Sequence, residues 1–177
     1  MSKPLRAYMF LFFINCPLLL LSQEEQSSAP LIDFETVSTY ADARNGDNVV
    51  HDFDNIFSSA QKAELTQVLK DFSTASTKEI SVLTVKNYAP YQDIQQYAAD
   101  LGNFLGMGGK NDANAVIVVL CRSRGALGIV PGTTAETVFT PAILNTIVEQ
   151  KMVPELSRGD FYKGMKNGVE AIIAQWQ

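Results

Sequence analysis

The stretch "ANAVIVVLC", residues 113–121, constrains the fold of this chain more than any other feature. Side chains of a β-strand alternate between the two faces of the sheet, and here both faces receive aliphatic residues. The stretch "EISVLTVK", residues 79–86, has the same two-sided pattern and is rich in residues that favour strands. We therefore predict a sheet whose central strands are enclosed between two helical layers.

Two segments with helical periodicity separate these strands from each other and from a short apolar strand at Val49 and Val50. The first helix is predicted to begin at Ser58, which forms a capping-box pattern with Gln61, and its apolar residues then recur at helical spacing. The second helix is predicted to open near Pro90, because proline is favoured in the first turn of a helix.

After the central strand, "GALGIV" at residues 125–130 reads as its hairpin partner, and two further helices follow. One is predicted to have Thr140 as its cap and Pro141 in its first position, and to stop at Pro154. The last carries Asp160 at its start, where the helix dipole favours a negative charge.

The predicted element order is strand, helix, strand, helix, strand, strand, helix, helix. This order indicates a three-layer α/β/α sandwich with a small mixed β-sheet, folded as a single domain over residues 49–177. A chain of 177 residues with 46% hydrophobic residues is suited to one domain with an ordinary core.

Residues 1–22 are organised like an export signal, with Lys3 and Arg6 followed by a nearly unbroken apolar run. This segment is interpreted either as a signal peptide or as an uncleaved membrane anchor. In the second case it would associate the protein with a membrane. We expect an exported protein, periplasmic or membrane-anchored and facing outside the cytoplasm. Residues 23–48 are polar and aperiodic and read as a flexible linker. The formal net charge is −5 and no basic run follows the leader, which argues against nucleic acid as a partner.

The segment "VVHDFDNIF", residues 49–57, raises the question of chemistry, because it places Asp52 and Asp54 directly after a strand. Haloacid-dehalogenase-type phosphatases open in this way, but the later acidic pair that holds their magnesium ion has no counterpart here. Cation-binding loops and plain turns capped by carboxylates share the same pattern. His51, the only histidine, is predicted to be an exposed residue at the strand edge.

A second group of oxygen-bearing side chains lies in "GMGGKNDAN", residues 106–114, which provides Asp112 and Asn114. The segment lacks the spacing of a phosphate-binding loop and reads as a helix C-cap and turn. If this loop lay near Asp52 and Asp54, their hard oxygens would suit Ca²⁺ or Mg²⁺. Carboxylates that cap turns and bind no ion are the alternative.

The order of these blocks resembles that of the TPM domain family. The opening "VHDFDNIFS", the middle block "GMGGKNDANAVIVVL", "IVPGTTAE" with Gly132 and Glu136, and the ending "VPELSRGDFYKGMKNGVEAI" all follow the family's arrangement. Thr133, Thr134 and Pro141 depart from it. The resemblance implies an α/β sandwich, divalent-cation binding and a proposed phosphatase activity, with Asp52, Asp112, Asn114 and Glu136 as site residues.

Three functions follow as hypotheses. The leading one is an exported or membrane-tethered module that binds a divalent cation (Ca²⁺ or Mg²⁺) and acts in a cell-envelope assembly with a protein partner. The second is a metal-dependent acid phosphatase using Asp52 or Asp54. The third is a protein-interaction domain without a ligand, in which these carboxylates only stabilise turns.

Overall fold

The computed structural model describes residues 29–37, 40, 49–107 and 114–177. Its centre is a four-stranded mixed sheet of β1 (Val50–Asp52), β2 (Glu79–Thr84), β3 (Ala115–Cys121) and β4 (Ala126–Pro131), in the order β1-β2-β3-β4. The first three strands are parallel, and β4 pairs antiparallel with β3. The two stretches predicted to be central, β2 and β3, are the inner strands of the sheet.

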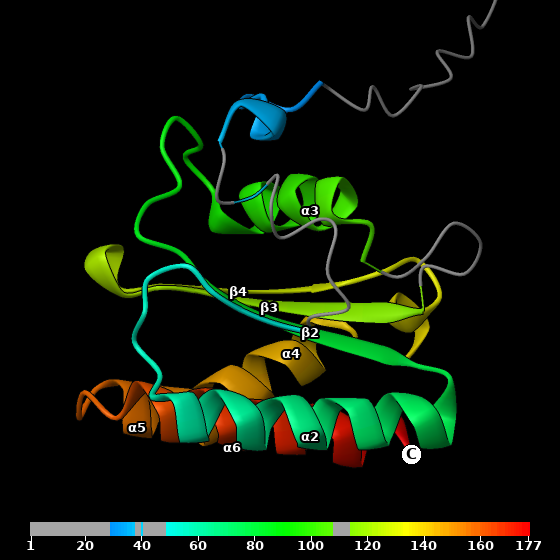
Figure 1. Cartoon of the computed structure of the whole chain (residues 1–177). Coiled ribbons are helices and arrows are strands. Elements are labelled where there is room, and N and C mark those ends of the chain that lie inside the picture. Colours follow the sequence, from blue (N-terminus) through cyan, green and yellow to red (C-terminus); the bar gives the residue numbers. More distant parts are fainter. Residues whose placement is uncertain (1–28, 38–39, 41–48, 108–113) are drawn as a thin grey trace, which may run out of the picture.

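Helices cover both faces of the sheet, as predicted (Figure 1). One face carries α3 (Ile94–Leu105), and the other carries α2 (Ser59–Ser76), α4 (Pro141–Ile147), α5 (Val153–Leu156) and α6 (Phe161–Trp176). A π-helical turn, η4 (Val148–Met152), joins α4 to α5. Short 3₁₀ turns lie at η1 (Phe34–Thr36), η2 (Arg122–Arg124) and η3 (Ala135–Thr137). The three-layer α/β/α fold of a single domain is confirmed.

The two-sided pattern of β2 and β3 produces two hydrophobic cores. Side chains such as Val82 and Val118 pack with Leu65, Leu69 and Ile172 on the side of α2 and α6. Their neighbours along the same strands, such as Leu83 and Val119, pack against α3 on the other side. All seven residues of β3 are buried, which is the burial that its unbroken apolar sequence predicts.

The predicted helix starts are largely confirmed. Ser58 and Gln61 form the capping box of α2, in which each side chain accepts from the backbone N–H of the other residue. Thr140 caps α4 with Pro141 in the first turn, and Asp160 caps α6 by accepting from Lys163 N–H at 3.1 Å. These caps satisfy backbone donors that helix termini leave without intrahelical partners.

Two predictions based on proline are wrong. Helix α3 does not open near Pro90: it begins at Ile94, and the carboxylate of Asp93 caps it by accepting from Gln95 N–H at 2.9 Å. Pro154 does not stop the third helix either. The π-turn η4 runs directly into α5, whose first turn contains Pro154, so the chain stays helical past this proline.

The described part of the predicted linker, residues 29–37 and 40, packs against the α3 side of the domain. Phe34 is 2% exposed and lies in the core next to α3, while the hydroxyls of Tyr40 and Tyr97 are hydrogen-bonded at 2.8 Å. Tyr40 also contacts Phe53, whose ring stacks on His51. His51 is therefore buried, at 6% exposure, and the prediction of an exposed histidine is wrong because upstream residues cover this edge.

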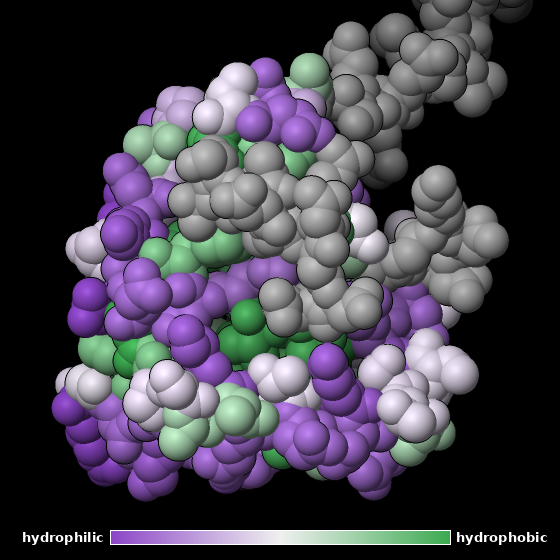
Figure 2. All heavy atoms as spheres, in the orientation of Figure 1, coloured by the Kyte–Doolittle hydropathy of each residue, from purple (hydrophilic) through white to green (hydrophobic). Residues whose placement is uncertain are grey.

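The face of the molecule towards the viewer is mainly hydrophilic over α2, with hydrophobic residues recessed between α2 and the sheet (Figure 2). Within the described ranges, none of the helices is both long enough and apolar enough to cross a bilayer. The predicted leader, residues 1–22, lies outside the described residues.

Candidate functional site

Asp52 ends β1 at the carboxyl edge of the parallel strands, where ligand sites of α/β proteins commonly form. Its Oδ1 accepts from Ile56 N–H at 3.0 Å and from the Thr84 hydroxyl, and its Oδ2 accepts from Phe57 N–H at 3.0 Å. Both carboxylate oxygens are thus engaged in holding the bend that leads from β1 into α2. This geometry is that of a turn-stabilising carboxylate.

Thr84 is a part of this arrangement that sequence reasoning missed. It ends β2 directly opposite Asp52, is fully buried, and its hydroxyl donates to Asp52 while accepting from Asp54 N–H at 3.2 Å. The backbone adds a bond from Phe53 N–H to the carbonyl of Thr84. The bend is therefore fastened to the neighbouring strand, and only the register of β1 against β2 could have revealed it.

Asp54 has a different environment. Its side chain is 9% exposed, and its Oδ2 lies 3.2 Å from Nε of Arg122, the first residue after β3. The two groups form an ion pair but are not aligned as a hydrogen bond, and this oxygen has no hydrogen-bond partner in the described structure. The guanidinium of Arg122 lies over the ring of Phe161 at 5.9 Å. Arg122 was not predicted, because nothing in its local sequence marks it as the partner of Asp54.

Asn114 and Glu136 lie at the opposite edge of the sheet from Asp52 and Asp54. Asn114 precedes β3, and its carbonyl accepts from the N–H of Glu79, the first residue of β2. Asp52 is level with Thr84 and thus with Leu120, six residues beyond Asn114, which corresponds to roughly 20 Å along the strand. Glu136 follows β4, and its N–H donates to the carbonyl of Gly132.

The hypothesis of a single shared site requires Asp52 and Asp54 to lie close to Asn114. The structure does not bring them together. The physical reason is that all three parallel strands begin at one edge and end at the other. Asp112 lies outside the described residues. Within the described ranges, no three His, Cys, Asp or Glu side chains are grouped closely enough to hold a metal ion.

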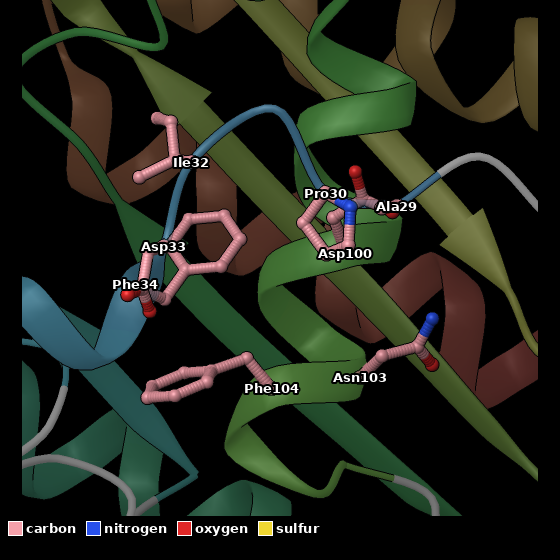
Figure 3. A pocket seen from close by; sticks show the side chains of 8 residues that line it. All are labelled: Ala29, Pro30, Ile32, Asp33, Phe34, Asp100, Asn103 and Phe104. Carbon is pink, nitrogen blue, oxygen red and sulfur yellow. The ribbon is translucent and has the colours of Figure 1, made fainter.

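A hollow of about 470 Å³ lies between residues 29–34 and α3, and it contains two carboxylates, Asp33 and Asp100 (Figure 3). Both carboxylates accept hydrogen bonds within the domain. Asp33 caps η1 by accepting from Glu35 N–H, and Asp100 accepts from the Tyr91 hydroxyl at 2.7 Å. Burial, together with the hydrogen bond to Asp100, raises the pKa of Tyr91 to about 12. The Tyr91 hydroxyl also accepts from Leu31 N–H, so these polar groups fasten the N-terminal segment to α3.

A family model for the TPM domain matches residues 50–175, which is most of the chain. No curated protein matches the sequence. The fold is similar to the N-terminal domain of a protein from P. gingivalis, with a TM-score of 0.66 and 20% identity, covering 77% of this chain and 85% of that one.

Two further solved structures share the fold. The N-terminal domain of the cg2496 protein from Corynebacterium glutamicum has a TM-score of 0.57 and 19% identity, covering 72% of this chain and 79% of that one. The BA42 protein from Bizionia argentinensis has a TM-score of 0.60 and 16% identity, covering 68% of this chain and 81% of that one.

Proposed function

Because this chain belongs to the TPM domain family, we propose that it is an exported binding module that acts by holding a protein partner of the cell envelope, without catalysis. The observation that carries this proposal is the engagement of both Asp52 oxygens inside the domain. The third of our sequence hypotheses, a protein-interaction domain, is the one that this geometry favours. Export rests on the signal-like pattern of residues 1–22.

A nucleophilic aspartate needs a free oxygen directed at the phosphorus atom. Asp52 directs its oxygens at the backbone of Ile56 and Phe57 and at the Thr84 hydroxyl, and freeing either oxygen would leave those donors without their acceptor. Asp54 is nine-tenths buried and paired with Arg122. The metal-dependent phosphatase hypothesis therefore gains no support from either carboxylate.

Cation binding remains a second candidate function, now at the amino edge of the sheet alone. Glu79 and Asn114 are joined through their backbones there, and Glu136 lies in the turn after β4, whose Gly132 donates to the carbonyl of Ala115. Carboxylate and amide oxygens are the ligands that Ca²⁺ and Mg²⁺ prefer. NMR titration with Ca²⁺ tests this candidate: shifts at Asn114 and Glu136 that disappear in Glu136→Gln support it, and their absence at millimolar Ca²⁺ excludes it.

Export is tested by fusing residues 1–48 to a reporter enzyme that becomes active only outside the cytoplasm. We expect reporter activity from the complete fusion and none after deletion of residues 1–22. Activity that survives the deletion would contradict the proposed role of this segment.

The absence of catalysis is tested by assaying the purified protein and its Asp52→Asn variant for turnover of an aryl phosphate with Ca²⁺ or Mg²⁺ present. We expect both to give the same background rate. Turnover by the native protein that is lost in Asp52→Asn, while the near-UV circular dichroism of the variant stays native, would overturn the proposal.

A further inference from the structure

The edge strand β4 leaves a row of backbone hydrogen-bonding groups directed away from the sheet. Among the described strands it pairs only with β3, and the bond from Gly132 N–H to the carbonyl of Ala115 fixes the alternation of that ladder. Counting back in steps of two, Val130, Gly128 and Ala126 exchange hydrogen bonds with β3. The N–H and C=O groups of Leu127 and Ile129 therefore point outward. None of the backbone bonds found outside the regular elements, in the described part of the chain, involves either residue.

Such an edge is usually protected, but β4 has few of the protecting features. Its sequence, "ALGIVP", contains no charged residue, and its single proline is at the last position, Pro131. Natural sheets discourage pairing at an edge with inward-pointing charges, central prolines or bulges. The sequence of β4 therefore does not by itself prevent another strand from pairing at this edge.

Two pockets border the β4 edge. A hollow of about 450 Å³ adjoins Leu127 and is lined by Arg122, Val148, Leu156 and Phe161. A second, of about 530 Å³, adjoins Ile129 and Pro131 and is lined by Gln95, Glu136, Leu144 and Asn145. We call these two hollows and the strand between them the β4 edge groove. Ile129 is 3% exposed as a whole residue and belongs to the core, so only a small part of it borders the groove, whereas Leu127 is partly buried.

Helices stand on both sides of the β4 edge groove. Gln95 reaches it from α3, while Leu144 and Val148 reach it from α4 and η4. Figure 1 shows the same arrangement, with α3 on one face of the sheet and α4 on the other. An extended segment brings only one strand to this edge, whereas the β4 edge of a second copy would also bring that copy's two helical layers.

The two ends of the groove carry opposite charges. Arg122, whose side chain is 48% exposed, lies at the Leu127 end, and the exposed Glu136 lies at the Pro131 end. The contact with Asp54 uses Nε of Arg122, and a guanidinium has five N–H donors in all. A complementary ligand therefore has an acidic residue at one end, a basic residue at the other, and apolar side chains between them.

We propose that the β4 edge groove binds an extended segment of a partner protein, which adds a fifth strand antiparallel to β4. Residues of the segment opposite Leu127 and Ile129 exchange backbone hydrogen bonds with them and place two apolar side chains, two residues apart, into the two hollows. The flanking basic and acidic residues of the segment face Glu136 and Arg122. This inference rests on the proposed function as a binding module and gives the module its docking site.

The probe for this proposal is the capped synthetic peptide Lys-Thr-Val-Thr-Val-Thr-Glu, titrated into isotope-labelled protein and followed by NMR. The valines are placed opposite Ile129 and Leu127. We expect the amide signals of these two residues to shift. Methylating the backbone nitrogens of both valines removes two donors and should weaken binding about tenfold or more, whereas methylating the threonine between them should have little effect.

A matched protein variant tests the charge pattern without touching the strand. Glu136→Lys should weaken binding of this peptide by up to about fivefold and should strengthen binding of the same peptide with its lysine replaced by glutamate. Shifts that avoid Leu127 and Ile129, or equal losses from both methylations, would overturn the proposal. Protection of these two amides by self-association of the protein without peptide would also overturn it, in favour of a second copy.

The outcomes separate this inference from the proposed function. Failure of the peptide to bind, with export intact and no phosphatase turnover, removes the docking site and leaves the binding module. Turnover that depends on Asp52 removes the module whatever the peptide does.

Discussion

Replacing Asp52 by alanine is expected to destabilise the domain by about 3 kcal/mol. The change removes the acceptor of two backbone N–H groups, those of Ile56 and Phe57, and of the buried Thr84 hydroxyl. Each lost capping or buried hydrogen bond of this kind costs about 1 kcal/mol, and the three are made by one residue. Asp52→Asn keeps one acceptor oxygen but places an NH₂ group against a donor. Its loss of unfolding free energy should therefore be roughly half that of Asp52→Ala.

Urea unfolding followed by fluorescence measures this change. Trp176 is the only tryptophan and is 4% exposed against Phe139, so its emission reports loss of the packed core. With a slope of about 2 kcal/mol per molar urea, the midpoint of Asp52→Ala should fall by about 1.5 M. Asp71→Ala is the matched control, because Asp71 is exposed on α2 and its carboxylate accepts a hydrogen bond from the Gln67 side chain. The midpoint of this variant should change by less than about 0.3 M.

A double-mutant cycle with Thr84→Val identifies the partner. Because the Thr84 hydroxyl donates to Asp52, the two changes together should cost about 1 kcal/mol less than the sum of the single changes. If Asp52→Ala left the unfolding midpoint unchanged, the carboxylate would not be stabilising the bend. Asp52 would then be free to act as a nucleophile or a metal ligand.

Three further predictions concern the packing of the domain. Phe34→Ala should lower the free energy of unfolding in urea by about 3 kcal/mol, because Phe34 is buried beside α3. Leu31→Ala is the control: Leu31 is 53% exposed, and this change should cost less than about 0.5 kcal/mol. Equal effects of the two changes would mean that residues 29–37 are not part of the folded unit. Gly164→Ala should lower the free energy of unfolding by roughly 1–3 kcal/mol, because the added methyl group would lie 2.7 Å from a Leu156 methyl and 3.2 Å from the Met152 carbonyl oxygen. An unchanged midpoint would show that the Leu156 side chain rearranges without cost. Stability should fall as pH rises from 10 to about 12, because Tyr91 ionises near its ordinary pKa of 10.0 when unfolded but only near 12 when folded. Tyr91→Phe should show a smaller alkaline loss in unfolding scans, and an identical loss would contradict the assignment.

The caps and strand patterns could be predicted because they are local. Ser58 with Gln61, and Thr140 with Pro141, satisfy helix N-termini within one turn of the chain, so their role is visible from spacing alone. The two-sided burial of residues 115–121 follows in the same way from period two and from aliphatic side chains on both faces. Element order and fold class rest on such signals.

Two of the errors arose because a proline alone did not decide the local structure, and the third arose from contact with a distant segment. Pro90 is compatible with a first helical turn, but Asp93 provides the cap and the helix starts after it. A proline usually ends a helix, yet here the π-turn η4 runs directly into α5 and the chain stays helical past Pro154. His51 is covered through Phe53 by Tyr40, a contact with a segment that has no periodic pattern of its own.

The sequence by itself determined which segments are strands and helices, and that two helical layers enclose the sheet. These features follow from hydrophobic periodicity and cap residues, which are signals within a few residues of the chain. Only the tertiary structure decided which groups the acidic residues contact. Asp52 is held in the bend because β2 presents Thr84 beside it, and Asp54 is paired because Arg122 directly follows β3. Asn114 lies far from both, since parallel strands carry their beginnings and their ends to opposite edges of the sheet.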